Sequence, residues 1–289
     1  MQASNSGIHH IRVGEVTVTA LNDGIAEGST DLLAGLPAAD AEALLRASFR
    51  KVPPRLTISA FLLTIGGRHV LVDAGSGNAM GPGHGMLHVH LATLGIDPAA
   101  ISTILVTHAH IDHAAGLIDE AGGARFPNAE IVINGTERDF WFDAGKAAAA
   151  PEAARDAFAL AVRCLTPYGN RTRTLRHGEA ALPGVTLQHL PGHTPGHSGW
   201  LVSSGSESLL IWGDVVHMPG IQFARPEAGM VFDVDVEQAR ASRARAFDMA
   251  ATDGLRVAGM HLDFPAFGHV VRAGSAYAFI PEVWSSAAP

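Results

Sequence analysis

The segment from Thr103 to Gly116 (T-I-L-V-T-H-A-H-I-D-H-A-A-G) constrains the fold of this chain more than any other. Its apolar start, Ile104 to Val106, predicts a buried strand, and the small residues at its end predict the start of a helix. Between them lie four potential metal ligands within six residues: His108, His110, Asp112 and His113. Burying several imidazoles and a carboxylate without partners is costly, so the segment predicts a metal site.

The bulk composition permits a large core and excludes several kinds of protein. Hydrophobic residues make up 47% and charged residues 17% of the 289 residues, which argues against disorder. The net charge of −8 argues against a nucleic-acid groove. The single cysteine, Cys164, excludes an internal disulfide framework and a cysteine-based zinc site. We find no apolar run of about 18 residues that would predict a membrane span.

The N-terminus is polar from Met1 to Gly7 and lacks the apolar core of a signal peptide. We therefore expect a cytoplasmic protein, or a periplasmic one if a leader was removed.

The order of apolar runs and turn residues predicts an α/β protein. We expect strands in residues 11–21, 56–65, 69–72, 104–106, 129–133, 184–190, 200–203, 208–212 and 256–260. We expect helices in residues 38–49, 86–94, 136–143, 147–165 and 236–251. The tail beyond residue 261, with Pro265 and Pro281, is expected to be irregular chain on the surface.

Several of the predicted strands end in a histidine or an aspartate: Asp73, His108, His193, Asp214 and His261. Sites in layered α/β folds gather where strand ends meet over a rigid sheet. Two strand-rich halves that each supply ligands predict two mixed sheets packed face to face with helices outside. We expect one domain over residues 1–289, with an N-terminal extension in 1–55 and a catalytic core in 56–289.

The spacing of these donors predicts two metal ions. His108 and His110 alternate on an extended segment and can face one ion, while Asp112 and His113 can face a second. Of the later strand ends, His193 would complete the first set and His261 the second. Asp214 is the candidate for a carboxylate that bridges the two ions. Two ions about 3.5–4 Å apart can share a hydroxide and stabilise developing charge, so hydrolysis needs no Ser or Cys nucleophile.

These motifs resemble a known family. T-H-A-H-I-D-H resembles the H-x-H-x-D-H signature of the metallo-β-lactamase superfamily, and P-G-H-T-P-G-H-S, W-G-D and G-M-H lie where that family carries its remaining ligands. L-V-D-A-G-S-G-N-A-M-G-P, F-P-N-A-E-I-V-I-N-G-T-E-R-D-F-W and H-L-D-F-P-A-F-G-H-V look most like the methyl parathion hydrolase branch, which also contains lactonases and aryl esterases. The resemblance covers roughly residues 55–280.

The resemblance implies a four-layer αββα sandwich and the same assignment of ligands, with zinc the expected metal and manganese, iron and cobalt alternatives. It gives Asp73 the role of orienting a ligand histidine, the alternative being a cap on the next turn. His197 is a candidate for a similar hydrogen bond. The branch also suggests a homodimer, formed through the segment from Leu32 to Phe49.

Other features of the sequence separate this chain from some relatives. Lactonases acting on N-acyl homoserine lactones typically place a Tyr three residues after the bridging Asp, where this chain has His217, so the phenol-assisted step is not expected. His217 is instead a candidate donor to the substrate or leaving group, with a structural role as the alternative. Cys164 lies in the wrong segment to be a ligand, and beyond Arg272 the tail lacks the basic thiol-binding domain of a thioesterase.

The predicted function is hydrolysis of a neutral, apolar small molecule: a lactone, an aryl ester or an organophosphate triester. A metal-bridging hydroxide attacks the carbonyl or phosphoryl centre, with catalytic roles for Asp112, Asp214 and His217. Phe140 and Trp141 are either pocket walls or core residues. The alternatives are a β-lactam or thioester hydrolase, an iron-dependent member with sulfur or oxygen chemistry, and a non-catalytic metal-binding protein.

Overall fold

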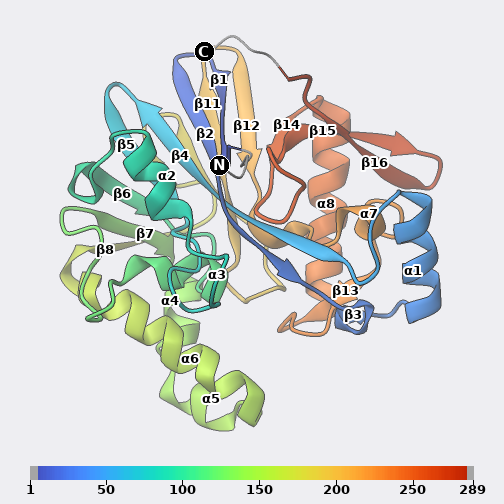
Figure 1. The fold of residues 1–289 in the computed structure, drawn as a ribbon, viewed down its shortest axis with the longest axis horizontal. Helices are drawn as coiled ribbons and strands as arrows, with labels where there is room; N and C mark the ends of the chain where they lie inside the picture. The colour runs from blue at the N-terminus through green and yellow to red at the C-terminus, as the bar shows by residue number, and fades with distance from the viewer. Residues whose placement is uncertain (1–5, 285–289) are drawn as a thin grey trace, which may run out of the picture.

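A computed structural model describes residues 6–284 and shows two seven-stranded sheets packed against each other (Figure 1). The first sheet has the order β1-β2-β4-β5-β6-β7-β8 and the second β16-β15-β14-β12-β11-β10-β9. The strands of the first sheet are β1 (Ile8–Val13), β2 (Val16–Glu27), β4 (Arg55–Ile65), β5 (Arg68–Val72), β6 (Ile101–Leu105), β7 (Glu130–Asn134) and β8 (Thr172–Leu175). Those of the second are β9 (Ala180–Leu182), β10 (Val185–His189), β11 (Ser198–Ser204), β12 (Glu207–Ile211), β14 (Arg256–Ala258), β15 (Phe267–Ala273) and β16 (Ala276–Pro281).

The core lies between the sheets and also beneath the helices. Alternate residues of β4 divide between the two regions: Phe61 and Leu63 face the second sheet, whereas Ala60 and Leu62 face the helices. A strand covered on both faces reads as a continuous apolar run, as β4 does from Ala60 to Leu63 and β6 does at Ile104 and Leu105. Trp200 and other inward side chains of the second sheet complete the inner layer.

Helices cover the outer faces and complete the predicted αββα sandwich. The first sheet carries α2 (Leu87–Thr93), α3 (Ile111–Ala114), α4 (Gly135–Trp141), α5 (Ala144–Ala149) and α6 (Glu152–Leu165), and the second carries α8 (Val236–Asp253). Elsewhere α1 (Ala38–Ala47) contacts α7 (Pro219–Gln222), and β3 (Leu33–Ala34) pairs with β13 (Gly229–Met230). No helix in residues 6–284 is long and apolar enough to cross a membrane.

Two expected elements were wrong. The helix predicted over 147–165 is two helices, α5 and α6, because Pro151 has no N–H to continue the first and instead precedes the second. The tail predicted as irregular chain forms the hairpin β15–β16, with Gly274 in the left-handed region at the turn. Pro281 sits at the last position of β16, so it interrupts no internal pairing of the sheet. The dimer through Leu32–Phe49 stays a prediction.

Candidate metal centre

The predicted ligands meet where strands of both sheets end. In the first sheet, β5, β6 and β7 run parallel, so the loops that follow Val72, Leu105 and Asn134 lie at one edge. The loop after β6 packs directly on the loop after β5, because a Cβ added to Gly116 would lie 1.9 Å from the carbonyl oxygen of Ala74. Only glycine permits this approach, which fixes the chain at the end of α3, just after Asp112 and His113.

Three imidazole nitrogens converge on one point. His108 Nε2 lies 3.0 Å from His110 Nδ1 and 3.2 Å from His193 Nε2, and the latter two nitrogens are 2.9 Å apart. Hydrogen bonds cannot satisfy all three, because a neutral ring nitrogen that donates has no lone pair left to accept. Ligands of a tetrahedral zinc ion lie roughly 3.3 Å apart, given Zn–N distances of about 2.0–2.1 Å. The spacing therefore fits a metal ion.

A second group of donors lies beside the first. His113 Nε2 and His261 Nε2 are 3.5 and 3.4 Å from Asp112 Oδ2. Although it is buried, His113 Nε2 has no hydrogen-bond partner among the described residues. A buried ring nitrogen with a free lone pair beside a carboxylate is suited to ligate a metal ion.

Asp214 joins the two groups. Its Oδ2 atom is 3.1 to 3.6 Å from five imidazole Nε2 atoms, those of His108, His113, His193, His217 and His261. Its Oδ1 atom is buried and has no hydrogen-bond partner among the described residues. A carboxylate surrounded in this way is placed to bridge two ions.

Burial and neighbouring charges set the protonation of the site. Burial, with the other imidazoles adding to it, lowers the pKa of His108 and His110 well below its usual range, so both rings are neutral and can ligate. Burial alone would raise the pKa of Asp214, but His113 and His261 outweigh it and hold that pKa well below its usual range. The Asp214 carboxylate is therefore ionised at neutral pH, as a metal ligand must be.

Each group contains histidines whose second nitrogen is held by a protein oxygen. His113 Nδ1 lies 2.8 Å from Asp73 Oδ2, and His261 Nδ1 lies 2.7 Å from the carbonyl oxygen of Thr57. His193 Nδ1 lies 2.8 Å from Asp233 Oδ1. Such contacts fix the tautomer and orientation of a ligand ring. The Asp73 contact is the one expected of a group that orients a ligand histidine, and that role stays a prediction. The contact of Asp233 was not predicted.

His197 holds the backbone of the bridging residue. Its Nδ1 donates to the carbonyl oxygen of Leu190 at 2.7 Å, which leaves Nε2 to accept from the N–H of Asp214 at 2.9 Å. Burial lowers the pKa of His197 to about 3, and the neutral ring is the only form that can accept this bond.

His217 lies on the other side of Asp214. Its side chain is buried, its ring stacks on that of His261 at 5.0 Å, and its backbone N–H donates to Gln222 Oε1. Neither ring nitrogen has a hydrogen-bond partner of good geometry among residues 6–284, although Nε2 is 3.1 Å from Asp214 Oδ2. Mainly because of burial, the pKa of His217 falls to about 4, so the ring is neutral at pH 7.

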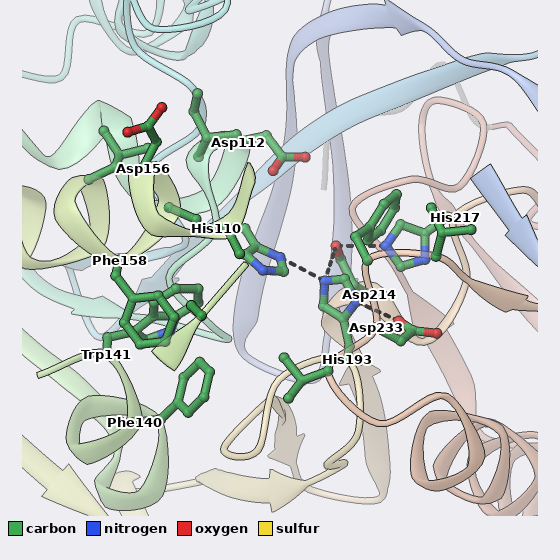
Figure 2. Close-up of a pocket in the computed structure, with 18 of the residues that line it drawn as sticks. His110, Asp112, Phe140, Trp141, Asp156, Phe158, His193, Asp214, His217 and Asp233 are labelled. Atoms are coloured by element: carbon green, nitrogen blue, oxygen red, sulfur yellow. Dashed lines mark hydrogen bonds and ion pairs between the residues drawn. The ribbon is translucent and has the colours of Figure 1, made fainter. Parts of the chain in front are cut away.

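An apolar cavity of about 1000 Å³ opens onto these residues (Figure 2). Phe140, Trp141 and Phe158 form an aromatic wall on one side, with ring centroids 4.9 to 5.0 Å apart. The Trp141 ring lies 5.5 Å from His110 in an edge arrangement. Trp141 is thus both 3% exposed and part of the cavity wall, so the alternatives of core and pocket residue were not exclusive.

Comparison with known proteins places this site in a family. The sequence pattern of the metallo-beta-lactamase superfamily matches residues 53–261, a range that contains both ligand groups. This chain belongs to the metallo-beta-lactamase superfamily. Its two donor groups would hold two divalent ions, and the donor set suits zinc.

Solved members of the superfamily include chains of nearly the same shape. The hydrolase AbOPH has a TM-score of 0.93 at 30% identity, with 98% of this chain and 100% of that chain covered. The dizinc quorum-quenching lactonase AidC has a TM-score of 0.91 at 28% identity, with 97% and 99% covered. The narrower resemblance to the methyl parathion hydrolase branch stays a prediction.

Curated relatives in the superfamily are N-acyl homoserine lactonases. The protein from Bacillus sp is 31% identical over 114 residues, which are 39% of this chain and 38% of that protein. AttM from Rhizobium radiobacter is 25% identical over 181 residues, which are 56% and 66% of the two chains. This chain thus matches about two fifths of the length of the Bacillus relatives.

The lowered pKa of His197 predicts a dependence of stability on pH. Because that pKa is about 3 when folded and 6.5 when exposed, the unfolded chain binds more protons between these values. The contribution of His197 to the free energy of unfolding is therefore fully present above pH 6.5 and lost as the pH falls toward 3. His197→Gln cannot take up this proton. The free energy of unfolding of the metal-free variant, measured with urea, should therefore fall less between pH 6.5 and 3 than that of the metal-free wild type. Parallel profiles for variant and wild type would contradict this assignment.

Proposed function

We propose that this protein hydrolyses neutral lactones that carry an apolar substituent, with N-acyl homoserine lactones as the substrate class. The observation that carries the proposal is the apolar cavity that opens directly onto the metal ligands. AidC, solved with the product N-hexanoyl-L-homoserine, and the curated lactonases support the same class.

The lining of the cavity suits an apolar substituent more than a charged one. Leu56, Ile58 and Val231 line it together with the aromatic wall of Phe140, Trp141 and Phe158. Each buried methylene of a substrate chain gains about 0.8 kcal/mol from leaving water. A longer acyl group or an aromatic leaving group would therefore bind more tightly than a small one.

The metal ions, when bound, supply an activated water and polarise the scissile carbonyl. The protein's own contribution is to hold the ligands in place and to set carboxylates among the imidazoles. Asp214 lies between the two donor groups, and Asp112 contributes the carboxylate of the second group. His197 fixes Asp214 through its backbone, so the carboxylate keeps its place between the two donor groups as charge develops.

His217 is proposed as the donor to the substrate. It lines the cavity, lies beside Asp214, and is neutral, so one ring N–H is available to a lactone oxygen or a leaving alkoxide. Gln222 accepts hydrogen bonds from the backbone N–H groups of His217 and Met218, which fixes the backbone that carries the ring. In this chain His217 would take the place that a Tyr typically has in the lactonases.

Aryl esters and organophosphate triesters form the second candidate class. The aromatic wall favours it, since Phe140 and Trp141 can stack on an aromatic leaving group as readily as they pack on an acyl chain. The same ligand set serves attack at phosphorus or at a carbonyl.

A substrate panel on the zinc-loaded protein tests the proposal. We expect kcat/KM for an N-acyl homoserine lactone with a long chain to exceed that for an unsubstituted lactone by at least about tenfold, given the transfer free energy of the buried chain. Rates would be measured by titrating the acid released, with an aryl ester, a phosphotriester, a thioester and a β-lactam in parallel.

Protein stripped of metal is the control in this panel and should be inactive on every substrate. Turnover of the phosphotriester or the β-lactam with no opening of either lactone would contradict the proposal. Oxygen uptake by iron-loaded protein, with no hydrolysis, would instead favour the oxygen chemistry of iron-dependent members.

Two variants separate the pocket from the chemistry. Trp141→Ala should raise KM for the long-chain lactone about tenfold with a smaller effect on kcat, since it removes apolar wall. His217→Phe should lower kcat by about 10²-fold with KM little changed, since it removes a proton donor. Phe142→Ala, at a 40% exposed position beside the same helix, is the matched control. Unchanged KM in folded Trp141→Ala, or unchanged kcat in His217→Phe, would contradict the respective role.

A further inference from the structure

Glu137 is a buried carboxylate that the chemistry described so far does not use. It lies in α4, two residues after the helix begins, and it has no exposed surface. No lysine, arginine or histidine forms an ion pair with it among the described residues. A charge buried without a cation needs several hydrogen bonds to be tolerated.

Four donors surround this carboxylate. Oε1 accepts from the N–H of Ala109 at 3.0 Å and from Trp141 Nε1 at 2.6 Å. Oε2 accepts from Thr194 Oγ1 at 2.5 Å and from the N–H of Gly196 at 3.1 Å. Both oxygens are therefore satisfied, and every partner is itself part of the site or of a loop that carries it.

Two of the partners are sequence neighbours of the ligands of one group. Ala109 lies between His108 and His110, and Thr194 follows His193. These three histidines are the ones whose nitrogens converge on one point. The four bonds leave Asp112, His113 and His261 without a direct link to Glu137.

The loop after His193 also packs against the helix that carries Glu137. A Cβ added to Gly196 would lie 2.1 Å from the backbone nitrogen of Glu137, so only glycine allows this approach. Asn134, at the N-terminus of the same helix, donates to Ser198 Oγ at 3.0 Å. Helix α4 and the loop from His193 to Ser198 thus form one rigid unit.

A neutral amide could not replace this carboxylate. At Oε1, the N–H of Ala109 and the indole N–H of Trp141 can only donate. At Oε2, the N–H of Gly196 can only donate as well. A glutamine would place its own NH₂ group against one of these donors in either orientation. The site therefore requires a group that accepts at both ends.

We propose that Glu137 is a positioning residue for one of the two metal sites, the one formed by His108, His110 and His193, and that it ties Trp141 to that site. It aligns the loop after β6 with the loop after β10, which come from different sheets. The aromatic wall and the three imidazoles then keep a fixed relation to each other. The inference concerns the metal centre and does not depend on which ester is the substrate.

A merely structural role makes a different prediction. Loss of general stability would weaken both metal sites alike, whereas the hydrogen bonds of Glu137 reach only one of them. The comparison therefore needs each site by itself. His261→Ala removes a donor of the second group and leaves the first, and His193→Ala does the converse.

The test is zinc affinity, measured by competition with a chromophoric chelator, for Glu137→Gln in each of these two backgrounds. In the His261→Ala background, we expect the protein with Glu137→Gln to bind zinc 10- to 100-fold more weakly than the protein that keeps Glu137. Losses of this size are typical when a group that supports the metal ligands is removed. In the His193→Ala background the affinity should not change. Glu130→Gln is the matched control, since it removes a carboxylate that pairs with Arg173 on β8, away from the metals.

Equal affinity for zinc with and without Glu137→Gln in the His261→Ala background would overturn the proposal, and so would an equal loss in both backgrounds. If Glu137→Gln does not fold, Thr194→Val removes one of the four bonds with little change of shape. It should weaken zinc binding selectively in the His261→Ala background, and an unchanged affinity there would overturn the proposal as well. Because the readout is metal binding, failure of the lactonase proposal would leave this test intact.

Discussion

The contact between the Asp214 carboxylate and the imidazoles around it is the interaction on which the rest of the structure depends. One oxygen of this buried side chain lies within 3.1 to 3.6 Å of five ring nitrogens. Without bound cations, such a cluster of unpartnered donors and acceptors would be costly to bury. Two divalent ions would remove that cost and supply the Lewis acid of the proposed hydrolysis.

The two sheets explain how distant residues reach this point. Strands β5 and β6 deliver Asp73 and the loop from His108 to His113, while β10, β12 and β14 of the second sheet precede His193, Asp214 and His261. Because both faces of the inner strands are packed, the strand ends have little freedom. Buried carboxylates then hold the candidate ligands in position. Asp73 and Asp233 each contact one histidine ring, and Glu137 joins two loops.

Sequence reasoning named the candidate ligands, which the structure brings together, because they are marked locally. His108, His110, Asp112 and His113 are close together in the chain, and His193, Asp214 and His261 each follow an apolar run. Glu137 and Asp233 carry no such mark, since the ligand loops that they contact lie 28 to 59 residues away along the chain. The hairpin β15–β16 was missed because prolines near its ends suggested irregular chain, and Pro151 was overlooked within an alanine-rich stretch. The aromatic wall beside His110 depends on packing that no spacing reveals.

Zinc stoichiometry tests the central claim, that Asp214 holds two ions at once. Metal content would be measured by mass spectrometry on dialysed protein, for wild type, His261→Ala and Asp214→Ala. With Asp214 as the bridge, wild type should bind about two zinc ions per chain, His261→Ala about one, and Asp214→Ala less than one, since both ions lose a ligand. Two tightly bound ions in folded Asp214→Ala would contradict the account.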